Sequence, residues 1–103
     1  MKFKKLPQFE RDYNKLTPEE RAKFKEMLAV FIPACDRYAL DVSGYTWPAS
    51  LRFEKLTSTK SVLAITWSFS GPDGRATFQF DTVDGELMVV WRRVGRHSIY
   101  KSP

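Results

Sequence analysis

Residues 63–80, with the sequence LAITWSFSGPDGRATFQF, decide the class of fold. Apolar side chains alternate with small or polar ones over residues 63–69, and the alternation returns over residues 75–80. Gly71-Pro72-Asp73-Gly74 stands between the two runs and consists of turn-forming residues. Because alternation with a period of two is typical of a strand with one packed face, the stretch predicts an antiparallel hairpin.

The second strand of this hairpin separates its side chains by face. Phe78 and Phe80 fall on one side, whereas Arg75, Thr77 and Gln79 fall on the other. We therefore expect Arg75 to point away from the helices of the protein, onto an exposed polar face of the sheet.

A further strand follows the hairpin. Asp84-Gly85 is a second turn signal, and residues 87–94 are apolar at consecutive positions up to Trp91. Such a run is typical of a strand that is buried on both faces near the centre of a sheet. Gly95 breaks the run, so residues 96–100 are expected to form a tight turn or a short final strand.

The first part of the chain has helical periodicity instead. Apolar residues at positions 6, 9, 13 and 16 recur at near-helical spacing around Pro7, which fits a first helical turn, and Phe3 fits a short strand before it. Thr17-Pro18-Glu19-Glu20 predicts the start of a second helix, because Thr17 and Glu20 can each bond the other's backbone amide. The apolar stripe of this helix, at positions 24, 27, 28 and 31, is expected to pack on the sheet.

Two less regular segments complete the fold. Pro33 is expected to stop or kink the second helix, and residues 34–48 are interpreted as a connecting loop. Residues 51–56 are expected to form a strand, with Arg52 on the side opposite Leu51 and Phe53. The order of elements predicts an α+β fold, in which two N-terminal helices pack on one face of a mainly antiparallel twisted sheet of about four to five strands. We treat residues 1–103 as a single domain, because each of two domains would be too small to bury a core.

The composition limits the classes of function. The chain has 17 Lys and Arg against 12 Asp and Glu, a net charge of +5, which is the sign expected of a protein that meets phosphate. Cys35 is the sole cysteine, so an internal disulfide is excluded, and no signal peptide or membrane-spanning run is apparent. These features predict a cytoplasmic protein without a membrane role. One His and one Cys give no metal-ligand spacing, and no Gly-rich phosphate loop is present, so we expect no metal and no small-molecule cofactor.

The most unusual stretch is residues 91–101, which hold the chain's one histidine among four cationic residues and no carboxylate. Arginine can donate two hydrogen bonds to a phosphate at once, and histidine can move protons near neutral pH. The stretch therefore fits charge stabilisation combined with acid or base catalysis, although a solvated basic surface would have the same composition. Arg52, Lys55 and Arg75 are expected to approach the same groove. Trp47, Trp67 and Trp91 are expected mainly in the core, which leaves Tyr45 or Tyr100 as comparable candidates for stacking on a base.

Five stretches, taken in order, resemble the RelE/HigB-like toxins of bacterial type II toxin–antitoxin systems, which belong to the RelE/ParE superfamily. They are FERDYNKL (residues 9–16), LRFEKL (51–56), ITWSF (65–69), GRATF (74–78) and VWRRVGRHSIY (90–100). The resemblance covers nearly the whole chain. The chain departs from the family at Ser68, where some relatives have arginine, and at Arg52, which stands in place of lysine.

The resemblance implies a toxin that enters the ribosome and cuts messenger RNA, and that an antitoxin protein encoded beside it holds inactive. It implies roles for residues at matching positions, and together with the basic stretch it predicts two sets. The catalytic set is His97, Arg75, Arg93 and Tyr100, with His97 as general acid or base. The RNA-binding set is Arg52, Lys55, Arg92, Arg96 and Lys101.

Several alternatives remain open at this point. The group that shares proton transfer with His97 could be Glu54, Tyr100 or Lys55, or a group on the nucleotide or ribosome, and Glu54 could equally form a salt bridge with Arg52 or Lys55. A ParE-like toxin that acts by binding DNA gyrase would share the fold and need no proton-transfer residue. A non-catalytic RNA-binding module would need only the basic groove and the aromatic side chains.

Overall fold

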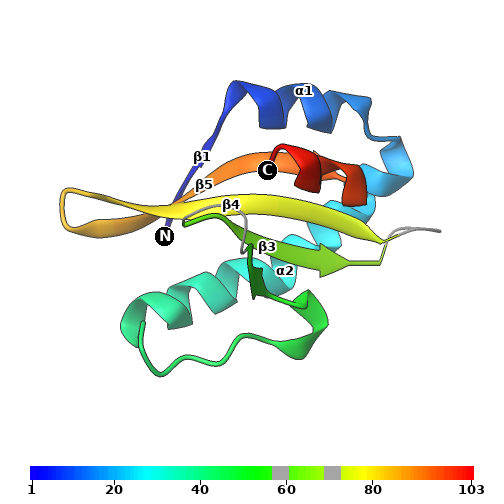
Figure 1. Ribbon diagram of the computed structural model, residues 1–103. Coiled ribbons are helices and arrows are strands. Elements are labelled where there is room, and N and C mark those ends of the chain that lie inside the picture. The colour runs from blue at the N-terminus through cyan, green and yellow to red at the C-terminus, as the bar shows by residue number, and fades with distance from the viewer. Residues whose placement is uncertain (57–60, 69–72) are drawn as a thin grey trace.

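A computed structural model describes residues 1–56, 61–68 and 73–103, and its centre is a mixed five-stranded sheet (Figure 1). The strands are β1 (Lys2–Lys5), β2 (Glu54–Lys55), β3 (Leu63–Trp67), β4 (Gly74–Val83) and β5 (Glu86–Gly95), in the spatial order β1-β5-β4-β3-β2. β1 runs parallel to β5 and the other neighbours are antiparallel. The predicted α+β fold is confirmed, as is the hairpin of β3 and β4. Gly71 and Pro72 of its turn lie outside the described residues.

Two helices and two short 3-10 helices complete the structure. They are α1 (Pro7–Lys15), α2 (Pro18–Leu40), η1 (Ala49–Leu51) and η2 (His97–Lys101). α2 lies across one face of the sheet and α1 contacts β5, while η2 lies on the opposite face (Figure 1). We call that opposite face the polar face, and define it by Thr66, Arg75, Thr77, Gln79 and Arg92.

α2 begins at the predicted capping box. The Thr17 side chain accepts a hydrogen bond from the Glu20 amide at 3.1 Å, and the Glu20 carboxylate accepts one from the Thr17 amide at 2.9 Å. Pro18 stands in the first turn, where its missing N–H costs nothing. The two bonds satisfy amides that the helix itself cannot pair.

Replacing Thr17 by alanine is expected to lower the free energy of unfolding by about 1 kcal/mol, because one end of the capping box is lost. Urea unfolding followed by circular dichroism measures the change. Thr46, an exposed loop residue, provides the matched control Thr46→Ala, which should leave stability nearly unchanged. If both variants lost the same free energy of unfolding, the capping box would contribute no more to stability than an exposed threonine in a loop.

The prediction that Pro33 stops α2 before a loop at residues 34–48 is wrong for residues 34–40, because the helix continues to Leu40. Pro33 is exposed, whereas Phe31, Ala34 and Cys35 on the other side of the helix are fully buried against the sheet. Proline removes one backbone bond from a helix interior, and the burial of these side chains outweighs that cost. Burial also raises the pKa of the Cys35 thiol to about 12, so it remains protonated as part of the core.

The predicted strand at residues 51–56 is mostly wrong. η1 follows Pro48, whose carbonyl accepts a hydrogen bond from the Leu51 amide, and Leu51 inserts its side chain into the core. Arg52 then takes a left-handed conformation with φ of 44°, so the strand is reduced to Glu54–Lys55. Arg52 therefore does not lie on a strand opposite Leu51 and Phe53. The strand alternative for residues 96–100 is also wrong, since His97–Lys101 forms η2.

An aromatic core joins both helices to the sheet. Trp91, on β5, contacts four phenylalanine rings at centroid distances of 5.1 to 5.7 Å: Phe9, Phe24, Phe31 and Phe78. Trp67 is buried as well and Trp47 packs half-buried against the core, so the core interpretation of the tryptophans is confirmed. β5 lies between two strands, with Val89, Val90 and Trp91 buried, as expected from its sequence.

None of the helices in the described ranges is long and apolar enough to cross a bilayer.

Candidate functional site

A hydrogen-bonded cluster lies where η2 packs on the polar face. The Arg75 guanidinium donates to the Thr66 hydroxyl at 2.8 Å and stands 5.3 Å from the centre of the Tyr100 ring. The Tyr100 hydroxyl donates to the Glu54 carboxylate at 3.1 Å, and the His97 ring centre lies 5.2 Å from that of Tyr100. We call these five residues the tyrosine cluster. It combines a cation, a carboxylate, a phenol and an imidazole within one contact network.

The Tyr100 phenol is a proton donor in this setting. Burial is the main cause that raises its pKa above the usual value, and the bond to Glu54 raises it further, while the nearby Arg75 opposes the rise. The hydroxyl therefore stays protonated at neutral pH. A guanidinium beside it would stabilise the phenolate that forms when the proton leaves.

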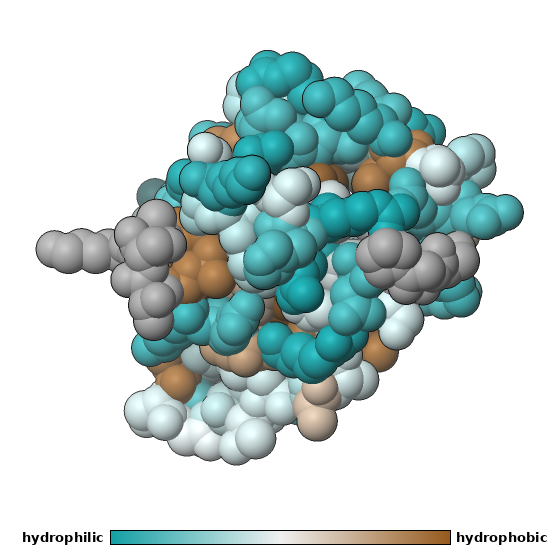
Figure 2. Space-filling model, turned by 45° about the vertical axis from the view of Figure 1, so that its right-hand side comes forward, coloured by the Kyte–Doolittle hydropathy of each residue, from teal (hydrophilic) through white to brown (hydrophobic). Residues whose placement is uncertain are grey.

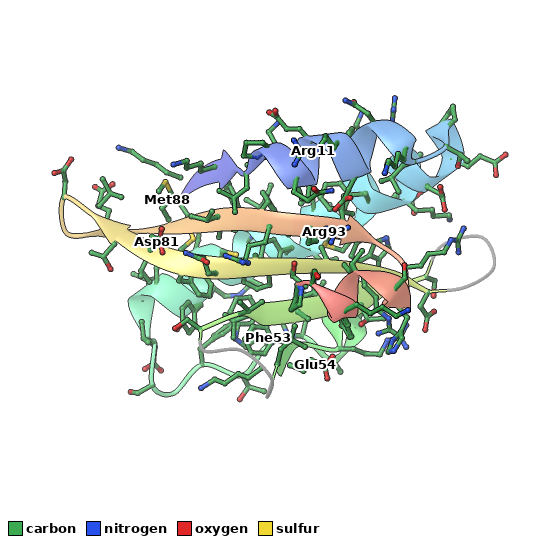
Figure 3. All side chains as sticks on the ribbon, turned by 45° about the horizontal axis from the view of Figure 1, so that its top comes forward. Arg11, Phe53, Glu54, Asp81, Met88 and Arg93 are labelled. Atoms are coloured by element: carbon green, nitrogen blue, oxygen red, sulfur yellow. The ribbon has the colours of Figure 1, made fainter. Side chains whose placement is uncertain are left out.

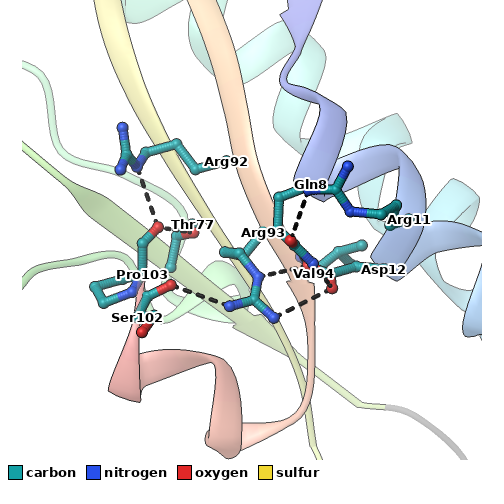
Figure 4. Close-up of polar contacts among 9 residues, drawn as sticks. All are labelled: Gln8, Arg11, Asp12, Thr77, Arg92, Arg93, Val94, Ser102 and Pro103. Carbon is teal, nitrogen blue, oxygen red and sulfur yellow. Dashed lines mark hydrogen bonds and ion pairs between the residues drawn. The ribbon is translucent and has the colours of Figure 1, made fainter.

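A β-bulge places two arginines side by side. Thr77 of β4 pairs with Arg93, whereas Phe78 pairs with Trp91, so Arg92 is the extra residue on β5. Such bulges redirect side chains. Here Arg92 reaches over the polar face to the Gln79 side chain at 2.8 Å, and the two arginines, which we call the arginine pair, donate to the main-chain oxygens of Pro103 and Ser102 (Figure 4).

Arg93, predicted as catalytic, forms an ion pair with a buried carboxylate and does not stand in an open site. It donates to both oxygens of Asp12, at 2.7 Å from Nε and 3.2 Å from Nη2 (Figure 4). Asp12 also accepts from the Val94 amide at 3.2 Å and from Gln8 at 3.0 Å. Burial acts to raise the Asp12 pKa, but the bonds from Arg93, Gln8 and Val94 together lower it. The pair fastens α1 to β5, beside the bulge.

Two of the predicted RNA-binding arginines also form ion pairs. Arg96 donates to Glu20 at 2.6 Å and so connects the end of β5 to the start of α2. Arg52 pairs with Asp73 at 2.9 Å, not with Glu54, which corrects the expected salt bridge. The bond to Arg52 is the main cause that lowers the Asp73 pKa, and the charge of Arg75 lowers it further.

The expectation of an open polar face is only partly met. The alternation of β4 is as predicted, but Thr77 is fully buried and Arg75 is half-buried, because η2 and residues 102–103 cover them. Lys55 on β2 and Lys101 on η2 are exposed. Figure 2 shows that this side of the molecule is mostly hydrophilic, and Figure 3 shows Arg93 beside α1, away from Glu54.

A pocket of about 500 Å³ opens elsewhere, between β1, α1 and α2, and its lining includes Phe3, Phe9, Leu28 and Ile32. Its walls carry no histidine or arginine. No group of three or more His, Cys, Asp or Glu side chains with metal-binding geometry occurs within residues 1–56, 61–68 and 73–103. Arg75, Tyr100 and His97 therefore lie outside this pocket, where η2 packs on the polar face.

Comparisons with protein-family models, with curated proteins and with solved structures gave no match for this chain.

Sequence reasoning missed the role of Asp12 altogether and left that of Glu54 undecided. A signal for Asp12 exists: it lies three residues after Phe9 and four before Leu16, so a charged group stands on the apolar stripe of a helix and requires a buried partner. Glu54 carries no comparable signal, because its partner Tyr100 is 46 residues away.

Proposed function

We propose that this protein is a toxin of a type II toxin–antitoxin system, a RelE/HigB-like endoribonuclease that cleaves messenger RNA on the ribosome. The observation that carries the proposal is the tyrosine cluster, in which Arg75, Tyr100 and His97 meet although they come from β4 and η2. These groups match the needs of phosphodiester cleavage: positive charge on the phosphate, a proton acceptor and a proton donor.

The cleavage step follows from these groups. His97 takes the proton of a ribose 2′-hydroxyl, the 2′-oxygen attacks the adjacent phosphorus, and the bond from phosphorus to the 5′-oxygen breaks. Tyr100 gives its proton to the leaving 5′-oxygen, and Arg75 stabilises both the phosphate charge and the phenolate. The products carry a 2′,3′-cyclic phosphate and a 5′-hydroxyl, and a later proton exchange with water restores both side chains.

Arg75 has capacity for such a phosphate. Its Nη1 donates to Thr66, but its Nε is buried and has no hydrogen-bond partner among the described residues. A buried donor without an acceptor is costly, so it favours a ligand that supplies one. A phosphate oxygen is such an acceptor, and arginine binds it with paired donors.

Incubation of the purified protein with messenger-programmed ribosomes, read by primer extension, tests the proposal. We expect cuts within the message with the product ends given above. The variant Arg75→Ala should cleave about 100-fold to 1000-fold more slowly, the usual loss when a charge-stabilising donor is removed. The matched control is Arg11→Ala, an exposed arginine on α1 that should leave cleavage unchanged.

The competing functions give different results in the same preparation. Inhibited supercoiling by DNA gyrase with intact message would replace the proposal by a ParE-like toxin. Binding to programmed ribosomes without cuts would replace it by a non-catalytic RNA-binding module. The His97–Tyr100–Glu54 arrangement favours the nuclease, because neither competitor needs groups that transfer protons.

The proposal includes an antitoxin partner encoded in the neighbouring reading frame, and action in the cytoplasm, where messenger RNA is translated. Expression of the protein alone should then arrest growth. Co-expression of the neighbouring frame's product should relieve the arrest and yield a complex on purification.

A further inference from the structure

The arginine pair and Thr77 direct three donors at two oxygen atoms. The Pro103 oxygen accepts from the Thr77 hydroxyl and from Arg92 Nε, both at 3.1 Å, and the Ser102 oxygen accepts from Arg93 Nη1 at 3.1 Å (Figure 4). Oxygens held by arginine forks and a hydroxyl resemble the surroundings of a bound phosphate. Ser102 and Pro103, which we call the tail, therefore occupy donors suited to an anion.

Arg92 carries the electrostatic part of this argument. No side-chain carboxylate within the described ranges forms an ion pair with Arg92, whose further partner is the amide of Gln79, itself bonded to Asp81. Arg93, in contrast, already has Asp12. A phosphate would supply Arg92 with the anionic partner that no side chain in these ranges provides.

The surroundings extend this charge across the polar face. Lys4 of β1 pairs in register with Val90, and Val90 pairs with Gln79, so Lys4 lies on the same face as Arg92. Arg75 lies on that face from β4, beside the tyrosine cluster. The cations therefore form a line from Arg75 through Arg92 toward Lys4, along which a nucleic-acid backbone can run.

The tail is fastened less firmly than η2. Ile99 is buried and anchors η2, whereas Ser102 is exposed and Pro103 is half-buried. The contacts described above join the tail to the arginine pair through main-chain oxygens. Loss of the tail's contacts would therefore leave the buried anchor of η2, and with it Tyr100, in place.

We propose that Arg92, Arg93 and Thr77 form a second subsite for a phosphodiester of single-stranded RNA, and that the tail covers this subsite until the RNA replaces it. The inference rests on the proposed function, since it assigns part of the same substrate. The cleaved phosphate lies at Arg75, and a phosphate farther along the strand lies at Arg92.

Fluorescence anisotropy with a labelled 2′-O-methyl oligoribonucleotide tests this, because that RNA lacks the attacking hydroxyl and cannot be cut by the proposed mechanism. Deletion of Ser102 and Pro103 should tighten binding about tenfold and steepen the slope of log affinity against log salt by about 0.7, the value for one added phosphate contact on a single strand. Arg92→Gln should abolish the gain in the deleted protein, while Arg11→Gln should leave it intact.

Thr77→Val in the deleted protein provides a second test, because it removes one of the three donors of the proposed subsite. It should reverse part of the gain in affinity. An unchanged affinity after the deletion, or a gain that survives both Arg92→Gln and Thr77→Val, would overturn the subsite. Added inorganic phosphate should weaken binding to the deleted protein, which would locate the effect in phosphate recognition.

The two proposals fail in different ways. If messenger RNA on programmed ribosomes stays intact, the proposed function fails and the subsite with it. If every variant binds equally and messenger cleavage persists, the proposed function stands and the subsite alone is wrong.

Discussion

Replacing His97 by alanine is expected to slow cleavage of ribosome-bound messenger RNA by about two to four orders of magnitude, the usual contribution of a general acid or base. The expectation follows from position: His97 is exposed at the start of η2, with its ring next to that of Tyr100. An exposed imidazole can reach a substrate, and its removal takes away no core contact. The loss should therefore appear in kcat, with stability and binding of the 2′-O-methyl RNA unchanged.

Ser98→Ala is the matched control for this variant, because Ser98 is the next residue of η2 and is also exposed. It should cleave at the rate of the parent protein. Full activity in His97→Ala would remove His97 from the mechanism and leave the Tyr100–Glu54 pair as the proton-transfer group. Glu54→Gln would then be the informative variant, since it keeps the shape and removes the negative charge.

The parts of the fold that sequence reasoning predicted correctly are those in which local chemistry decides. The capping box needs only Thr17 and Glu20, three residues apart, and the hairpin follows from alternation on either side of one turn. The turn at Asp84-Gly85 has positive φ at both residues, 52° and 79°, which is the reason these residue types occur there. Each signal lies within a few positions of its effect.

The errors arise where distant packing prevails over local preference. Pro33 is a helix breaker by propensity, but Ala34 and Cys35 behind it are fully buried against the sheet. Leu51 inserts into the core from η1, and the left-handed Arg52 that follows it prevents the strand from beginning before Phe53. Helix and strand propensities could not show that the side chains of α2 and of η1 are buried, because the residues that cover them are far away in sequence.

The candidate site divides in the same manner. His97, Arg75 and Tyr100 were predicted together from residue type and family resemblance, and the structure places them in one cluster. Arg93 is predicted with them, but it forms an ion pair with Asp12, 81 positions away. A basic stretch in a sequence cannot show which of its arginines already has a carboxylate.

Replacing Asp12 by asparagine is expected to lower the free energy of unfolding by about 3 kcal/mol, because it leaves Arg93 partly buried without its counter-charge. Asp12 is 6% exposed and Arg93 is 23% exposed, so the value lies at the low end for buried ion pairs. For a domain whose total stability is about 5 to 15 kcal/mol, this is a large fraction. Urea unfolding at neutral pH measures it.

The contribution of Asp12 should also depend on pH in one direction. Its pKa is lower in the folded than in the unfolded protein, so its stabilisation is fully present above the unfolded value of about 4 and is lost as the pH falls through the folded value. The stability of the parent protein should therefore decline below about pH 4 by more than that of Asp12→Asn, which cannot titrate there. An equal decline in the stability of the two proteins at acid pH would show that folding does not stabilise the ionised carboxylate.

Two further variants separate the ion pair from general effects of the substitution. Asp84→Asn changes an exposed aspartate at a left-handed turn position that asparagine also favours, and it should leave stability nearly unchanged. The double variant Asp12→Asn with Arg93→Gln should lose less than the sum of the two single losses, because the second change removes the charge that the first leaves unpaired. Strict additivity would mean that the two side chains contribute independently. In that case the β-bulge that positions the arginine pair would depend on the backbone pairing of β4 and β5 alone, and the ion pair with α1 would not contribute to it.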